Sequence, residues 1–121
     1  MNKFKITVTT TLLSLSLMSV STYANVVTAA QVEIEAARAE RTLQASNELQ
    51  KGNYSKAIEY AEPVANAPIT EFNQEIISNS QFILGYSYLA KKNKKKAILW
   101  FQKSCKNGFS SSCSMLEKIK R

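Results

Sequence analysis

The side chains that could support chemistry in this 121-residue chain are few. Cys105 and Cys113 are the only cysteines, and the serine run Ser110 to Ser112 lies between them. The chain has no histidine and no aspartate, so it lacks the usual general bases, most metal ligands and the histidine that would activate a nucleophile. The sequence therefore predicts a protein that is not an enzyme, with no catalytic residue, no metal and no cofactor.

The two cysteines have three alternative states. In an oxidising compartment neighbouring thiols usually pair, so a disulfide between Cys105 and Cys113 is the default expectation for an exported chain. Two free thiols are the second alternative. A weak metal site is the third, although it would need ligands beyond these two sulfur atoms.

The N-terminus has the pattern of a secretory signal peptide. Lys3 and Lys5 precede an uncharged stretch over residues 6–20, which is too short and too rich in Thr and Ser for a stable membrane span. Thr22 and Ala24 are the small residues at the two positions that a signal peptidase reads. A retained membrane anchor or a buried core helix over residues 6–20 is the alternative.

We therefore expect cleavage after Ala24, with residues 1–24 as the signal peptide. Residues 25–121 then form one small domain, located in the periplasm or secreted, with no stable membrane span after cleavage.

Charge is distributed unevenly along the chain, whose net charge is +7. Residues 25–90 hold four basic residues and eight glutamates, whereas residues 91–121 hold ten basic residues and one glutamate. The C-terminal third is therefore a basic surface, and its lysine run comprises Lys91, Lys92, Lys94, Lys95 and Lys96. Such a run is usually a solvated turn, and the functional alternative is docking on an acidic protein patch, an anionic lipid surface or a polyanion. Nucleic acid is not expected, because no base-stacking motif accompanies the lysines.

Five segments have the composition of helices, separated by Gly52-Asn53, by the region of Pro68, by the lysine run and by Asn107-Gly108. The predicted helices cover residues 29–49, 54–64, 70–90 and 97–106, and a last short helix runs from the serine run to Lys120. In the first helix, Val32, Ala36, Leu43 and Leu49 are the expected buried stripe. In the third, Thr70 is the expected cap and Phe72 begins the apolar face.

Two of these helical hairpins align with each other. Residues 52–60 align with residues 92–100 through a shared Lys-Ala-Ile followed by an aromatic residue. Ala57 and Ala97 stand 40 residues apart in this alignment, which is close to the period of helical-hairpin repeats.

At these positions the sequence resembles the tetratricopeptide repeats and their Sel1-like relatives. Leu84, Gly85 and Tyr88 resemble the Leu-Gly-x-x-Tyr of the first helix of such a repeat. Residues 96–103 resemble the Lys-Ala-x-x-Trp-Phe-x-Lys of the second helix in Sel1-like proteins. The resemblance implies an all-α fold, a short array of antiparallel helical hairpins with about two repeats and a C-terminal capping helix. The residues it implies for repeat packing are Gly52, Tyr54, Ala57, Leu84, Gly85, Tyr88, Ala97, Trp100 and Phe101.

The cysteines carry a further resemblance. Cys105 and Cys113, with Gly108 between them, are similar to the cysteine pair of secreted cysteine-rich Sel1-like proteins. That similarity implies a bridge which joins the end of one hairpin to the next helix.

Two functions of different classes follow. The first is an exported adaptor or scaffold that binds a protein or peptide, and since first helices line the groove in the resembling proteins, Asn79, Gln81 and Tyr86 are candidate partner-binding residues. The second is a basic protein that docks on anionic lipid or a polyanion through its lysine-rich C-terminal third, for which the five lysines of the run are the candidates. A secreted effector is a third hypothesis, suggested only by the resemblance.

Overall fold

The structure, a computed structural model, describes residues 28–120, and the predicted signal peptide lies outside them. Within residues 28–120 the chain forms five helices and no strand, which confirms the predicted all-α class. The chain divides after Ile34 into two units, Met1–Ile34 and Glu35–Arg121. The described part of the first unit, residues 28–34, is helical, and the packing below is that of the second unit.

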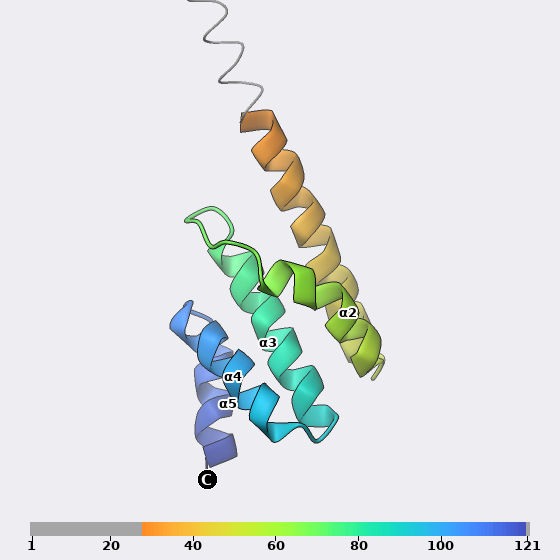
Figure 1. Cartoon of the computed structure of the whole chain (residues 1–121), viewed down its shortest axis with the longest axis vertical. Coiled ribbons are helices and arrows are strands. Elements are labelled where there is room, and N and C mark those ends of the chain that lie inside the picture. Colours follow the sequence, from red (N-terminus) through yellow and green to blue (C-terminus); the bar gives the residue numbers. More distant parts are fainter. Residues whose placement is uncertain (1–27, 121) are drawn as a thin grey trace, which may run out of the picture. The chain divides into compact units, whose positions relative to one another are not determined.

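Short turns join the helices, except that a longer loop over residues 66–73 connects α2 to α3 (Figure 1). A first helix covers residues 28–50, and the others are α2 (Tyr54–Ala65), α3 (Gln74–Ala90), α4 (Lys94–Lys106) and α5 (Ser110–Lys120). Within the second unit α3 packs against both α2 and α4, and α5 packs on α4. This is the expected array of neighbouring helices.

Three helices of the second unit end in the same way. A residue with a left-handed backbone follows the helix: Gly52 (φ 78°), Lys92 (φ 63°) and Gly108 (φ 94°). The next amide then donates back to a carbonyl five residues earlier, as in the 2.9 Å bond from Asn53 N to Glu48 O and the 2.8 Å bond from Asn93 N to Tyr88 O. The turns at 52 and 92, forty residues apart, therefore share one backbone geometry.

Small residues allow the helices to approach closely. Ala45, Ala57 and Ala61 are completely buried in one cluster with Ile83 and Leu84. Between α3 and α4, Gly85 lies against the ring of Phe101, which is itself fully buried. The core is thus made of alanine and glycine contacts with a few large side chains between them.

Buried hydroxyl groups link the helices through this core. Thr42 and Ser80 Oγ are 2.8 Å apart, which ties the first helix to α3. Ser104 of α4 donates to the carbonyl of Ser78 at 2.7 Å and accepts from Ser112 of α5 at 2.6 Å. Hydrogen-bonded serines therefore link α3, α4 and α5 within the core.

The third predicted helix begins later than expected. Thr70 is not its cap, because the Thr70 amide donates to the Asn73 side chain at 2.7 Å within a turn, and α3 starts at Gln74. Phe72 is 79% exposed in that turn, so its assignment to the buried face is wrong.

The fourth helix begins earlier than expected. The Asn93 side chain accepts a hydrogen bond from Lys96 N at 3.2 Å and caps α4. Lys94, Lys95 and Lys96 therefore form the first turn of α4 instead of a loop.

The buried stripe predicted for the first helix is wrong at three of its four positions, while Leu49 is half-buried against the core cluster. Leu43 is 61% exposed, and Val32 and Ala36 are exposed as well. The side chains buried on this helix are Thr42 and Ala45, because they are the ones that face α3 and the core cluster.

Candidate functional site

A hollow of about 250 Å³ lies between the first helix and α3. Two hydrogen bonds join these helices at a constant separation of 38 residues, Thr42 with Ser80 and Asn73 Nδ2 with Glu35 Oε1 at 3.1 Å. The two helices therefore run in the same direction. We call this hollow the groove, and its lining residues are Ala39, Thr42, Leu43, Ser46, Glu75, Ile76 and Asn79.

The groove combines apolar and polar groups. Leu43 is largely exposed and Ile76 half-buried, so apolar surface remains open to solvent. Ser46, Asn79 and Glu75 place hydroxyl, amide and carboxylate groups in the same lining. Such a mixture suits an extended ligand that presents both an apolar side chain and backbone amides.

A second hollow, of about 430 Å³, opens on another side of α3. It shares Glu75 with the groove, and the α4–α5 turn closes it, where Gln74 Nε2 donates to Asn107 O at 2.9 Å. Phe109 lies in its lining, and its ring contacts that of Phe82 in a tilted arrangement with a centroid distance of 5.1 Å. Glu75 thus lies between the two hollows, and a ligand bound in the groove could extend past it into the second hollow.

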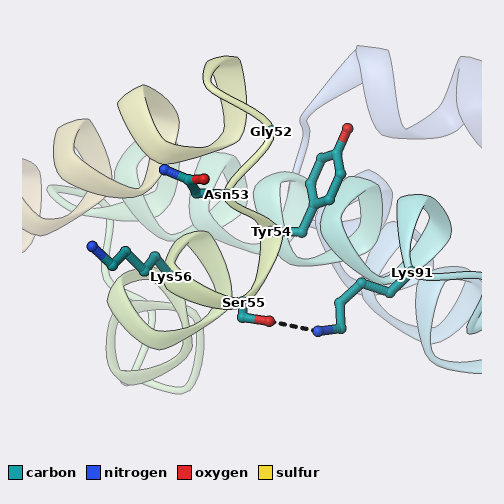
Figure 2. A pocket seen from close by; sticks show the side chains of 6 residues that line it. All are labelled: Gly52, Asn53, Tyr54, Ser55, Lys56 and Lys91. Atoms are coloured by element: carbon teal, nitrogen blue, oxygen red, sulfur yellow. Dashed lines mark hydrogen bonds between the residues drawn. The ribbon is translucent and has the colours of Figure 1, made fainter.

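A third hollow, of about 380 Å³, lies at the start of α2 and is basic (Figure 2). Its lining includes Lys56 and, from the end of α3, Lys91, whose Nζ donates to Ser55 Oγ at 2.6 Å. Asn53 does not cap α2, because its side chain donates to Glu48 Oε2 at 2.7 Å. That hydrogen bond, with the charges of nearby lysines, lowers the pKa of the Glu48 carboxyl.

The residues predicted for repeat packing lie in the helix contacts or in the turns. Ala57, Leu84, Ala97 and Phe101 are fully buried. Tyr88 and Trp100 are half-buried against the core cluster, and their rings are covered by Lys96 Nζ at 5.1 Å and Lys103 Nζ at 4.5 Å. Gly52 forms the turn before α2, and Tyr54 begins that helix.

The candidate partner-binding residues of α3 are only partly brought together. Asn79 lines the groove, and Tyr86 is 41% exposed beside Phe82, with ring centroids 6.2 Å apart. Gln81 is buried, donates to Ala65 O at 3.2 Å and accepts from Asn107 Nδ2 at 2.9 Å. Its assignment to a binding surface is therefore wrong, because both ends of its amide are used between helices.

Of the seven residues that line the groove, the sequence predicts only Asn79 as a site residue. Leu43 was assigned to the core, and Ile76 and Glu75 were not singled out as site residues. Their common surface depends on how the first helix lies along α3, which a single helix pattern does not reveal. An alignment of residues 28–50 with α3 at an offset of 38 residues, the separation of Thr42 from Ser80 and of Glu35 from Asn73, could have supplied this information.

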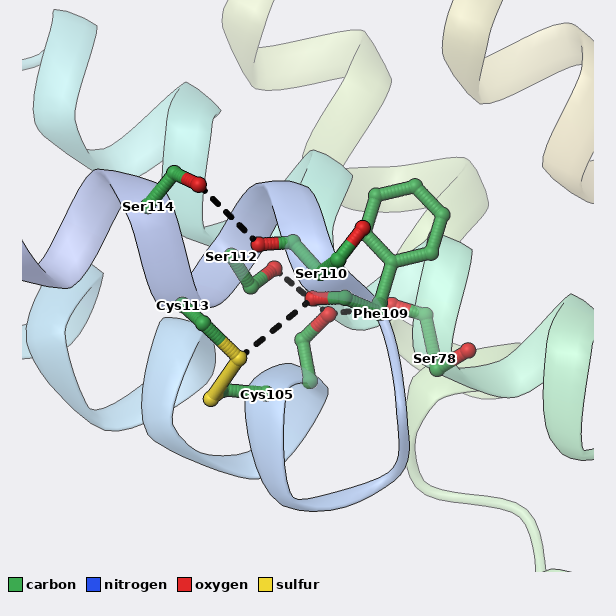
Figure 3. The surroundings of a disulfide bond; sticks show 8 residues. Ser78, Cys105, Phe109, Ser110, Ser112, Cys113 and Ser114 are labelled. Carbon is green, nitrogen blue, oxygen red and sulfur yellow. Dashed lines mark hydrogen bonds between the residues drawn. A yellow bond between two sulfur atoms is a disulfide. The ribbon is translucent and has the colours of Figure 1, made fainter.

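The predicted disulfide is present. Cys105 of α4 and Cys113 of α5 are bonded, with Cα atoms 4.9 Å apart, and residues 28–120 contain no free cysteine. The bond lies beside the hydroxyl of Ser112 (Figure 3). The expectation of a disulfide is confirmed, and α5 is covalently fixed to α4.

Over residues 28–120, no group of three or more His, Cys, Asp or Glu side chains is placed to hold a metal ion. No helix in that range combines the length and the apolar character needed to cross a bilayer.

Compared with known protein families, with curated proteins and with solved structures, the chain matches none of them.

Proposed function

We propose that this chain is an exported helical-repeat protein that binds a segment of a protein partner in the groove and acts as an adaptor or scaffold without catalysis. The observation that carries the proposal is Leu43, a leucine 61% exposed in a hollow between two parallel helices. An exposed leucine alone is ordinary on a protein surface. Here it adjoins Ile76 and a rim of hydrogen-bonding groups, which is the composition of a recognition site.

The turns at Gly52 and Lys92 support a repeat architecture, because they share one backbone geometry forty residues apart. The sequence resemblance to tetratricopeptide and Sel1-like repeats points the same way. Proteins of this architecture stack hairpins so that their first helices form a common binding surface. The groove lies between the first helices of the two hairpins.

The disulfide supports export. Disulfides persist in oxidising compartments and are rare in the cytosol. Mass analysis of the protein from its native envelope or culture medium, without reductant, tests this part of the proposal. The expected species begins at Asn25 and is two hydrogens lighter than its reduced form, whereas a cytosolic chain that retains residues 1–24 would contradict export.

The groove is tested by comparing two exposed leucines. Leu43→Glu places a charge in the groove, and the matched control Leu99→Glu places the same charge on α4, where Leu99 is 52% exposed and outside the groove. Partner capture from the envelope fraction is measured with the parent chain and both variants. Loss with Leu43→Glu alone, at both low and high salt, is expected, because apolar burial is insensitive to screening. Equal capture by both variants would reject the groove.

A further inference from the structure

Positive charge gathers at the edge of the helical array where α2 and α4 begin. The α3–α4 turn lies beside the start of α2, as the hydrogen bond from Lys91 to Ser55 shows (Figure 2). Six lysines belong to this region, which we call the basic edge: Lys56, Lys91, Lys92, Lys94, Lys95 and Lys96. It shares no residue with the groove.

The backbone adds to this charge. The N-terminus of a helix carries a partial positive charge, and acidic residues in the first turn ordinarily offset it. Neither α2 nor α4 has an acidic residue in its first turn, and α4 has three lysines there. Glu48, near the end of the first helix, lies beside the start of α2. Its carboxylate already accepts a hydrogen bond from Asn53 and forms an ion pair with Lys51.

Two of these arrangements are unfavourable for the folded chain itself. Lys92 adopts φ 63°, a conformation that glycine provides without strain at the corresponding position 52. Lys94 and Lys95 face an unfavourable helix dipole. The side chains of Lys92, Lys94 and Lys95 form no hydrogen bond or ion pair with any other residue in the range 28–120. A bound anion would reduce the electrostatic cost of placing these lysines at a helix N-terminus, which no hydrogen bond or ion pair of their side chains within residues 28–120 reduces.

We propose that the basic edge docks on the phosphate groups of an anionic phospholipid surface. The lysines come from the start of α2, from the α3–α4 turn and from the first turn of α4, so they spread across two helix starts instead of enclosing one ligand. A planar array of phosphates satisfies such a spread of charges better than a single small anion. The hollow of about 380 Å³ lined by Lys56 and Lys91 gives one headgroup phosphate a place at the start of α2, which the Asn53 side chain does not cap.

The test is vesicle cosedimentation of the full chain. Binding to vesicles of phosphatidylglycerol mixed with phosphatidylcholine is compared with binding to phosphatidylcholine alone, and the difference is the readout. Lys3, Lys5 and the apolar residues 6–20 are the same in the parent chain and in every variant, so their contribution cancels when the variants are compared. The edge variant replaces Lys92, Lys94 and Lys95 by Gln. The control variant makes the same charge change at exposed lysines elsewhere, Lys106, Lys118 and Lys120.

The expected result is a preference for anionic vesicles that weakens about fivefold for each edge lysine replaced, on the order of 100-fold for three, with a much smaller effect of the control variant. The preference should fall as salt is raised. Equal losses in the two variants would overturn the proposal in favour of a general effect of net charge. Binding to heparin without binding to anionic vesicles would overturn the lipid assignment and indicate a soluble polyanion.

Discussion

Gly85 of α3 lies directly against the ring of Phe101 of α4, so that a β-carbon at position 85 would stand 2.6 Å from Cδ1 of that ring. Phe101 is completely buried, so a shift of its ring would displace the side chains packed around it. Gly85→Ala should therefore lower the free energy of unfolding by about 1 to 3 kcal/mol, although alanine is the better helix former. Urea denaturation followed by circular dichroism measures the change.

A smaller side chain at position 101 provides the control for this prediction. Phe101→Leu creates a cavity by itself and is destabilising, but in that background Gly85→Ala should cost much less than it does beside the ring. If the alanine were equally costly in both backgrounds, the contact with Phe101 would not be the cause.

The disulfide should contribute measurably to stability despite its short loop. A separation of eight residues between Cys105 and Cys113 corresponds to about 2 to 3 kcal/mol in the chain-entropy model. We expect the free energy of unfolding, obtained from urea denaturation, to fall by that amount in the Cys105→Ser, Cys113→Ser double variant. Adding reductant should shift the parent chain but leave the double variant unchanged; a shift in both would point to an effect of the reductant itself.

Two buried serines should respond to alanine in opposite directions. Ser104 accepts from Ser112, so Ser104→Ala leaves a buried hydroxyl without its acceptor and should cost about 1 to 3 kcal/mol. Ser87 is fully buried, and its hydroxyl has no hydrogen-bond partner among residues 28–120. Ser87→Ala should raise the free energy of unfolding by about 1 kcal/mol. Both changes gain the same helix propensity, so each controls the other in denaturant titrations.

The corresponding turn positions 52 and 92 provide another matched pair. Lys92→Gly removes left-handed strain from a lysine and should stabilise the chain by about 1 kcal/mol. Gly52→Ala should destabilise it by a similar amount, and through the backbone alone, since no atom lies within 4 Å of an added β-carbon. Thermal melts of both variants test the signs. A destabilising Lys92→Gly would mean that the lysine side chain contributes to the fold.

The elements that sequence predicted well are those set by local signals. The turns at Gly52 and Gly108 were placed correctly because glycine there supplies a left-handed residue after a helix. The disulfide was placed because only one cysteine pair exists. The start of α4 was missed by three residues, since the cap is Asn93 within a run of lysines that looked like a loop.

The groove could not be predicted for a different reason. Leu43 and Ala45 are both apolar, and the packing of the first helix in the core cluster with α2 and α3 decides that Ala45 is buried and Leu43 exposed. Gln81 shows the converse, because a polar residue on α3 is buried through hydrogen bonds to Ala65 and Asn107, which are distant in sequence. In an array packed through alanine, glycine and serine, residue type is a weak guide to the buried face.

The covalent bond between α4 and α5 makes the two ends of the array unequal in how readily they open. Amide hydrogens next to Cys105 and Cys113 should exchange slowly with solvent, since the disulfide restricts local opening there. The first helix is held to α3 without a covalent bond, by packing and by hydrogen bonds such as that of Thr42 with Ser80. We therefore expect the first helix, which forms one wall of the groove, to separate from α3 more readily than α5 separates from α4.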